Sequence, residues 1–331
     1  GIAGEKGCKY ACVVNDMDRA AGRSGVGTVM GSKNLKAVAI RGTKGVQVKD
    51  APRFLGAVSD AKQALADNAV TGQGLPAFGT QVLMNVINET GALPTRNFKD
   101  VQFEGANDIS AEAMVEVRSS DGKANLVNTA ACFGCTIACG RVSQIERTHF
   151  SVKDRPEYHK ASGGLEYESA WSLGAAAGIN DLDALTFANF LCNEHGIDPI
   201  TFGATLGAAM EMFEDGAITT KETGGIDLKF GNAEALCELV ELTGKQEGFG
   251  VDLGLGSKLL CEKYGRPELS MSVKGQEFPA YDARGIQGMG LTYATSNRGA
   301  CHLRSYTVAS EVLGIPEKTD PHVSEGKAGL V

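Results

Sequence analysis

The periodicity of apolar residues changes near residue 50, and this change constrains the fold more than any other feature of the sequence. From Arg53 to Asn68 the apolar residues fall at helical spacing, directly after an Asp50-Ala-Pro segment that is typical of a helix start. Strand patterns are sparse from there onward. We therefore expect a mainly α fold, in which a short N-terminal α/β segment precedes a helical body.

Further helices are predicted in the body, each bounded by Gly, Asn-Asp or Pro. They are expected at residues 80–89, 173–177, 182–194, 200–215, 233–243 and 253–264. Long loops are expected at 90–160 and 265–300. Before residue 50, Leu35–Arg41 alternates apolar with polar or small residues and predicts a strand, which Val46 and Val48 can extend.

Composition excludes several classes of protein. A net charge of −8 over 331 residues does not suit binding to a phosphate backbone, so no nucleic-acid partner is expected. No stretch reaches the roughly 18 to 20 apolar residues that span a bilayer. The closest one, Phe202–Met212, is interrupted by two glycines. We expect a soluble, cytoplasmic protein with no membrane span, and, since the N-terminus has no Met, a fragment or a processed chain.

The strongest local signal is Cys132-x2-Cys135-x3-Cys139, three of the nine cysteines within eight residues. The thiols could be small buried apolar groups. A structural zinc ion is a second possibility, but it wants four ligands, usually from two C-x2-C pairs, and no second pair exists here. An iron–sulfur cluster with a fourth thiolate from elsewhere is favoured. The spacing of these cysteines is the reverse of the C-x3-C-x2-C spacing of radical-SAM enzymes, so that class of enzyme is disfavoured.

A glycine-rich segment, Gly22–Lys33, suggests a nucleotide loop but has the wrong spacing for one. Gly27 and Gly31 enclose three residues where a Walker A loop needs four, and the dinucleotide fingerprint fails by one residue as well. Glycines still let backbone N–H groups approach an anion, and Arg23 adds positive charge. The segment predicts either a phosphate-bearing ligand or a plain turn.

Two further segments contain groups suited to proton transfer. Glu166-Tyr-Glu168 precedes an apolar, Gly-rich run, where partial burial would raise a carboxyl pKa, although both acids could equally be solvated residues of a helix start. In Asn297–Arg304, His302 lies between Arg298 and Arg304. This histidine could be structural, but the flanking guanidinium groups favour a nearby anion.

Taken together, these segments resemble the aldehyde:ferredoxin oxidoreductase family of tungsten enzymes. The resemblance rests on four motifs in order: Gly22–Ala37, the three cysteines, Glu166-Tyr-Glu168 and Tyr293–His302. It runs over nearly the whole chain. It implies three parts, namely residues 1–50 as the end of a β-rich cofactor-binding domain, 51–271 as a helical second domain, and 272–331 as a truncated helical third domain.

The resemblance also implies the cofactors and their ligands. Arg23 and the backbone at Ser24, with Gly25 and Gly27 allowing close approach, would face the phosphates of a paired pyranopterin cofactor that holds tungsten or molybdenum, and a Mg²⁺ ion that bridges these phosphates. Arg298 and Arg304 would be further anchors. A family loop that contacts one pterin corresponds to Asn193-Glu-His-Gly-Ile197-Asp198, with Asn193 in place of an Asp. Cys132, Cys135 and Cys139 would hold a [4Fe–4S] cluster, with the family's fourth cysteine expected beyond residue 331.

The activity implied by the resemblance is the oxidation of an aldehyde to a carboxylic acid. Glu168 would accept a proton, and Tyr167 would shape the pocket. His302, on the opposite wall, would form a hydrogen bond with the aldehyde or with the metal oxygen. The electrons would leave to a ferredoxin or an iron–sulfur subunit, and a homodimer is possible. The alternatives are another low-potential reduction on the same scaffold, of a carboxylate or an aromatic thioester ring, and a non-catalytic iron–sulfur or zinc module.

Overall fold

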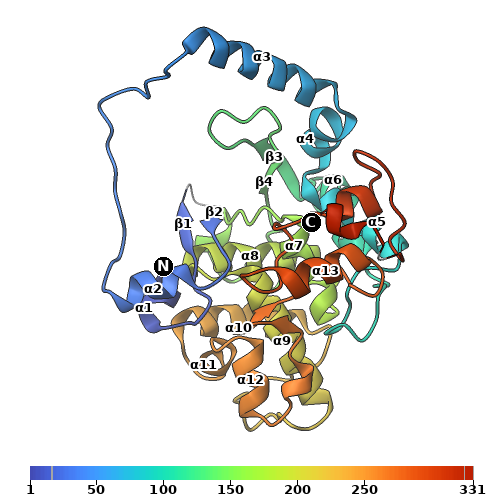
Figure 1. Cartoon of the computed structure of the whole chain (residues 1–331). Helices are drawn as coiled ribbons and strands as arrows, with labels where there is room; N and C mark the ends of the chain where they lie inside the picture. Colours follow the sequence, from blue (N-terminus) through green and yellow to red (C-terminus); the bar gives the residue numbers. More distant parts are fainter. Residues whose placement is uncertain (16–17, 324, 331) are drawn as a thin grey trace.

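Four helices form the centre of the molecule (Figure 1). They are α7 (Tyr167–Leu173), α8 (Leu182–His195), α9 (Pro199–Glu214) and α10 (Ala233–Lys245). In the computed structural model, which describes residues 1–15, 18–323 and 325–330, α10 packs on α8 and α7 packs on α9. The predicted mainly α fold is confirmed.

The glycines that interrupt the apolar run of α9 are explained by this packing. A Cβ atom at Gly203 would lie 2.1 Å from the carbonyl oxygen of Ser172, the penultimate residue of α7. A Cβ atom at Gly207 would lie 2.7 Å from the carbonyl oxygen of Ala176. Because α9 is buried on nearly all sides, it can be apolar all round without being a membrane helix.

The remaining elements are short except for α3, which has 17 residues. The other helices are α1 (Ile2–Lys6), α2 (Val26–Ser32), α3 (Ala51–Asp67), α4 (Leu75–Phe78), α5 (Leu83–Glu89), α6 (Ala111–Val115), α11 (Gly250–Leu253), α12 (Ser257–Lys263), α13 (Gln287–Thr295) and α14 (Val308–Glu311). The strands form three antiparallel pairs: β1 (Val13–Asn15) with β2 (Arg19–Ala21), β3 (Leu126–Ala130) with β4 (Gly140–Ser143), and β5 (Ser272–Val273) with β6 (Gln276–Glu277).

Most of the predicted helices are confirmed, but three expectations are wrong in detail. The helix at 253–264 is divided into α11 and α12, because Gly256 adopts φ 83° and ψ 162°. Residues 173–177 are the end of α7 and a 3-10 turn. The segments expected as long loops contain α6, β3 and β4 in 90–160, and β5, β6 and α13 in 265–300.

The strand predicted at Leu35–Arg41 is also wrong. Figure 1 shows residues 35–50 as an open connection between α2 and α3, and Ile40 and Val46 are 88% and 95% exposed. An alternating pattern is compatible with a strand, but a strand also needs a hydrogen-bonded neighbour. Among the described residues no segment pairs with this one. Helix α3 likewise buries none of its residues.

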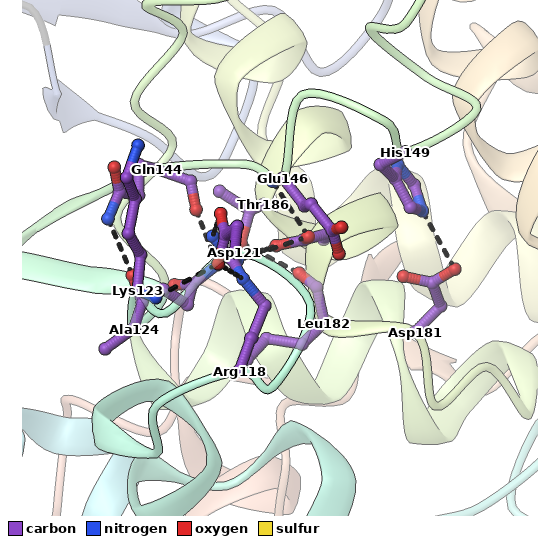
Figure 2. A network of polar contacts seen from close by, with 12 residues as sticks. Arg118, Asp121, Lys123, Ala124, Gln144, Glu146, His149, Asp181, Leu182 and Thr186 are labelled. Carbon is purple, nitrogen blue, oxygen red and sulfur yellow. Dashed lines mark hydrogen bonds and ion pairs between the residues drawn. The ribbon is translucent and has the colours of Figure 1, made fainter.

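A polar network fixes both ends of the cysteine hairpin, which we define as β3, β4 and the loop 131–139 between them. Figure 2 shows this network, in which segments on either side of the hairpin meet the first turn of α8. The carboxylate of Asp183 accepts hydrogen bonds from Arg118 Nη1 at 3.3 Å, Asn125 Nδ2 at 3.1 Å and the backbone N–H of Glu146 at 3.0 Å. One buried carboxylate therefore holds the chain before β3 and after β4.

No helix within residues 1–15, 18–323 and 325–330 is long and apolar enough to cross a membrane.

The predicted division of the chain into three parts, with boundaries at residues 50 and 271, stays a prediction.

Replacement of Asp183 tests this network. Asp183→Ala leaves Arg118, Asn125 and the Glu146 N–H without their shared acceptor, so the free energy of unfolding should fall by about 3 kcal/mol or more. Asp227 is the control, because it makes only an exposed ion pair with Lys229. Asp227→Ala should change stability by less than about 1 kcal/mol. Urea denaturation measures both, and equal losses in the two variants would contradict the assignment.

Candidate active site

A cavity of about 700 Å³ lies beside the first turn of α7. Its walls come from segments far apart in the sequence and are mostly apolar. They consist of Ala69, Val70, Gly74, Leu75, Thr80, Val82, Leu83, Val86, Glu166, Tyr167, Glu168, Ser169, Asp198, Pro199, Ile200, Tyr281, His302, Leu303, Tyr306 and Leu313. Carboxyl groups are present in this lining, but no Lys or Arg side chain is. Such a cavity fits an uncharged ligand with an apolar body.

Glu168 lies in the first turn of α7 and is largely buried, with 14% of its side chain exposed. Its Oε2 accepts a hydrogen bond from the backbone N–H of Ala280 at 3.0 Å, whereas its Oε1 is buried without a partner. Burial raises the pKa of this carboxyl to about 8. Near pH 7 in this environment the group is mostly a neutral acid with one free oxygen.

His302 lies next to this free oxygen. Its Nδ1 is 3.9 Å from Glu168 Oε1 and is itself buried, and no group among the described residues forms a hydrogen bond with it. Burial, with the nearby charges of Arg23 and Arg298, lowers the pKa of His302 to about 3, so the ring is neutral. The expectation that Glu168 and His302 stand on opposite walls is wrong. The structure instead brings together two buried polar atoms that a bound oxygen group could satisfy.

The aromatic wall of the cavity is made by three tyrosines. Tyr167 donates from its hydroxyl to the carbonyl oxygen of Ala280 at 2.7 Å, and its ring lies 5.5 Å from that of Tyr281. The hydroxyls of Tyr281 and Tyr306 are 2.9 Å apart. Sequence reasoning missed Tyr281 and Tyr306, which belong to no motif. Tyr167 lines the cavity, and its role in shaping a substrate pocket stays a prediction.

Glu166 has a different environment from Glu168. It precedes α7 and binds Arg19 Nη1 at 3.0 Å and the Thr80 hydroxyl at 2.6 Å. The same Thr80 oxygen accepts from the backbone N–H of Tyr167 at 3.0 Å. Glu166 therefore ties the start of α7 to β2 and to the 3-10 turn at Thr80–Val82, a connection that sequence reasoning also missed.

Arg23 is almost fully buried and bonded to the protein. It donates to the carbonyl oxygens of Ala300 at 3.0 Å and Glu277 at 2.7 Å, and its Nε lies 3.5 Å from Asp198 Oδ2. Asp198 also caps α9 by accepting from the backbone N–H of Ile200 at 3.3 Å, and it accepts from the Thr201 hydroxyl at 2.8 Å. In this arrangement Arg23 ties β6 and the segment before His302 to α9. Its contact with cofactor phosphates stays a prediction.

The other predicted anchors are divided between two places. Ser24, Gly25 and Arg298 line a polar hollow of about 260 Å³, together with Lys9, Lys274 and the buried Glu277. Three cations and the exposed backbone of a turn fit an anionic group such as a phosphate. Gly25 has φ 70°, and a Cβ atom there would lie 2.3 Å from a backbone oxygen.

Gly27, Ile197, Asn193 and Arg304 lie outside this hollow. Gly27 packs closely against the backbone of Cys12, and Ile197 is buried. Asn193 lines a separate cavity of about 610 Å³ beside Cys132. Arg304 is exposed and lines neither this cavity nor the polar hollow. The cofactor roles of these four residues stay predictions.

The three cysteines lie on the exposed loop of the cysteine hairpin, with Cys139 half-buried. The backbone N–H of Ile137 donates to Cys135 Sγ at 3.4 Å, and backbone hydrogen bonds of this kind lower the pKa of the Cys135 thiol. Such donors to sulfur are typical of iron–sulfur ligands. In the described part of the chain, no three Cys, His, Asp or Glu side chains converge on one point, so the cluster site stays a prediction.

Comparison with known proteins identifies the family. The description "Aldehyde ferredoxin oxidoreductase, N-terminal domain" matches residues 1–42, and "Aldehyde ferredoxin oxidoreductase, domains 2 & 3" matches residues 56–331. The chain therefore belongs to the aldehyde ferredoxin oxidoreductase family, which confirms the resemblance seen in its motifs.

Individual relatives agree with this assignment. The chain is 46% identical to the tungsten-containing aldehyde ferredoxin oxidoreductase of Pyrococcus furiosus over 333 residues, and 44% identical to that of Thermococcus kodakarensis. Each match covers 100% of this chain and 52% of the relative. A more distant relative, the WOR-like subunit of an aliphatic sulfonate oxidoreductase of P. furiosus, is 27% identical over 91% of this chain. The chain spans about half the length of the curated relatives it matches.

A solved structure shares the fold. The active site complex BamBC of benzoyl coenzyme A reductase superposes with a TM-score of 0.69 at 20% identity, covering 90% of this chain and 44% of that one.

The environment of Glu168 predicts a pH dependence of stability. Its pKa is about 8 in the folded chain against 4.5 in the unfolded one, so the folded chain binds more protons between these pH values and its stability falls as pH rises through them. Glu168→Gln should remove this fall, while Glu166→Gln should keep it. Urea denaturation at pH 5, 6.5 and 8 measures the difference. The same slope in wild type and Glu168→Gln would refute the buried neutral carboxyl.

Proposed function

We propose that this chain is part of a tungsten-dependent oxidoreductase that converts an aldehyde and water into a carboxylic acid, two protons and two electrons. The observation that carries the proposal is the pair of unpartnered atoms, Glu168 Oε1 and His302 Nδ1, at an apolar cavity in a member of this family. A tungsten bis-pyranopterin would supply the two-electron redox step, and a [4Fe–4S] cluster would pass the electrons on singly to a ferredoxin-type partner.

The residues near the cavity fit such a cofactor. The polar hollow with Lys9, Lys274 and Arg298 beside the Ser24 turn would hold phosphate groups and a Mg²⁺ ion. The spacing of Cys132, Cys135 and Cys139 and the backbone donors to Cys135 suit a cluster. Arg19 of β2, whose Nη2 lies close to Gly140 of the cysteine hairpin, forms an ion pair with Glu166 at the start of α7.

Glu168 and His302 divide the proton chemistry. Glu168 in its ionised form, which is the minor form near pH 7, accepts the proton released when the oxygen of water adds to the carbonyl carbon. This carboxylate is a stronger base than a solvated one, because its pKa is near 8. His302, neutral because its pKa is about 3, forms a hydrogen bond with the substrate oxygen without adding a charge to the cavity. Tyr167 closes one wall and excludes water.

The cavity favours uncharged aldehydes over acidic substrates. Its lining contains three carboxyl groups and no cationic side chain, so a carboxylate or a phosphate would enter without a counter-charge. This distribution of charge argues against a carboxylate or a coenzyme A thioester as the substrate of this chain. It also argues for an enzyme rather than an electron-transfer or zinc module, since a module of that kind needs no such cavity.

The catalytic assignment is tested in the full-length, cofactor-loaded enzyme. Glu168→Gln should reduce kcat for aldehyde oxidation about 10²- to 10⁴-fold, because it removes the proton acceptor, while tungsten, pterin and iron contents stay at wild-type levels. Glu166→Gln should cost much less, because Glu166 faces Arg19 and Thr80. A severe loss in Glu166→Gln with a nearly normal Glu168→Gln would mean that the roles are reversed.

The cluster assignment has its own test. Cys135→Ser should lower the iron bound per chain in anaerobically purified protein and reduce the visible absorbance that dithionite bleaches. Cys237→Ser is the matched control, since Cys237 is buried and its Sγ lies 3.8 Å from the carbonyl oxygen of Ala184. Its iron content should remain normal. A colourless wild-type protein that contains stoichiometric zinc would end the iron–sulfur assignment.

A further inference from the structure

One wall of the cavity is weakly held by the rest of the protein. We call residues 69–78 the α4 wall, since they comprise Ala69, the π-helical turn Val70–Gly74 and helix α4. Ala69, Val70, Gly74 and Leu75 of this wall line the cavity. None of the residues in the π-helical turn or in α4 is buried. Apolar burial therefore contributes little to fixing this wall, and polar contacts must do more.

Arg141 supplies such contacts. Its side chain is buried, with the residue 2% exposed, and its Nη2 donates to the carbonyl oxygen of Leu75 at 2.7 Å. Its Nη1 lies 3.5 Å from the carbonyl oxygen of Pro76 and 3.3 Å from that of Gly140. The acceptors are all backbone carbonyl groups, and two of them belong to α4. A buried guanidinium is costly unless it is hydrogen-bonded, so these bonds hold α4 against β4.

Two glycines leave the space that Arg141 occupies. A Cβ atom at Gly79, directly after α4, would lie 2.5 Å from Arg141 Nε, and Gly79 adopts φ 62° and ψ −167°, a conformation that other residues rarely reach. A Cβ atom at Gly164 would lie 1.8 Å from the backbone carbonyl oxygen of Arg141. Gly79 therefore leaves room for the guanidinium of Arg141, and Gly164 leaves room for the backbone of the strand that carries it.

We propose that Arg141 is a positioning residue, which holds the α4 wall in place and thereby makes the cavity select bulky, apolar, uncharged aldehydes. The proposal rests on the proposed function and adds to it the substrate class and the residue that sets it. Arg141 touches neither the substrate nor the reacting atoms, because the lining of the cavity does not include it. It acts through Val70 and Leu75, whose side chains cover the apolar part of a substrate.

The first test compares two aldehydes on the full-length, cofactor-loaded enzyme. Arg141→Gln should raise KM for an aromatic aldehyde, such as cinnamaldehyde, about tenfold, as expected when apolar contacts are lost. The kcat for acetaldehyde, which makes few contacts with the wall, should stay within about twofold. Arg141→Lys keeps the charge but not the forked donor, so it should give an intermediate KM. Gly79→Ala should also raise KM for the aromatic aldehyde, because the added Cβ atom would displace the Arg141 guanidinium.

Arg155→Gln is the matched control. Arg155 makes its ion pair with Glu241 at 3.2 Å and lines neither the cavity nor the α4 wall, so KM for both aldehydes should be unchanged. An equal change of KM in Arg155→Gln and Arg141→Gln, or an Arg141→Gln enzyme with unaltered selectivity between the two aldehydes, would overturn the proposal.

Hydrogen exchange separates this proposal from the proposed function. Amides of residues 69–79 should exchange faster in Arg141→Gln than in wild type or Arg155→Gln, whether or not the enzyme turns over. If the wild-type enzyme oxidises no aldehyde, the proposed function fails, and the selection of aldehydes by the wall fails with it. If residues 69–79 exchange at the same rate in all three proteins, Arg141 does not position the wall, even in an active enzyme.

Discussion

The close packing of α7 against α9 is the contact on which the rest of the site depends. Gly203 lets α9 approach the carbonyl oxygen of Ser172, and this approach fixes the axis and rotation of α7. Because α7 begins at Tyr167, its first turn presents Tyr167 and Glu168 to the cavity. Glu166, one residue earlier and outside the helix, is directed to Arg19 instead. Two carboxyl groups only two residues apart therefore acquire different partners, different burial and different chemistry.

Burial also gives the ionisable side chains of the site different charge states, depending on whether they have a partner of opposite charge. The cation of Arg23 is buried between Asp198 and Glu277, so its charge has partners, and burial still raises the pKa of the Glu277 carboxyl. Glu168 and His302 have no such partners, and the less costly state for both is neutral. The result is a cavity with hydrogen-bonding capacity but little net charge at its reactive end. That combination agrees with the proposed aldehyde substrate, whose carbonyl group needs polarisation and proton transfer more than charge neutralisation.

The sequence predicted those parts of the structure that depend on local pattern. Helices α8, α9 and α10 have long apolar periods and clear caps, so their bounds were close to those observed. Helix α13 was missed because its apolar residues are not gathered on one face. The prediction of a strand at Leu35–Arg41 was wrong, because an alternating pattern of apolar residues does not show whether a neighbouring strand is present to pair with. Within the site, Tyr281, Tyr306 and Arg141 belong to no motif, and the approach of Glu168 to His302 arises only from tertiary packing.

Two arginines connect the cysteine hairpin to the cavity. Arg19 lies on β2, outside the hairpin, and Arg141 lies on β4, within it. Arg19 meets the hairpin at Gly140, where a Cβ atom would lie 2.2 Å from its Nη2, and its other contact is Glu166 at the start of α7. Arg141, two residues after Cys139, reaches α4. Helix α7 and the α4 wall are therefore both attached to the cysteine hairpin, the first through Arg19 and the second through Arg141. A displacement of the hairpin would alter the position of Glu168 and the shape of the cavity together.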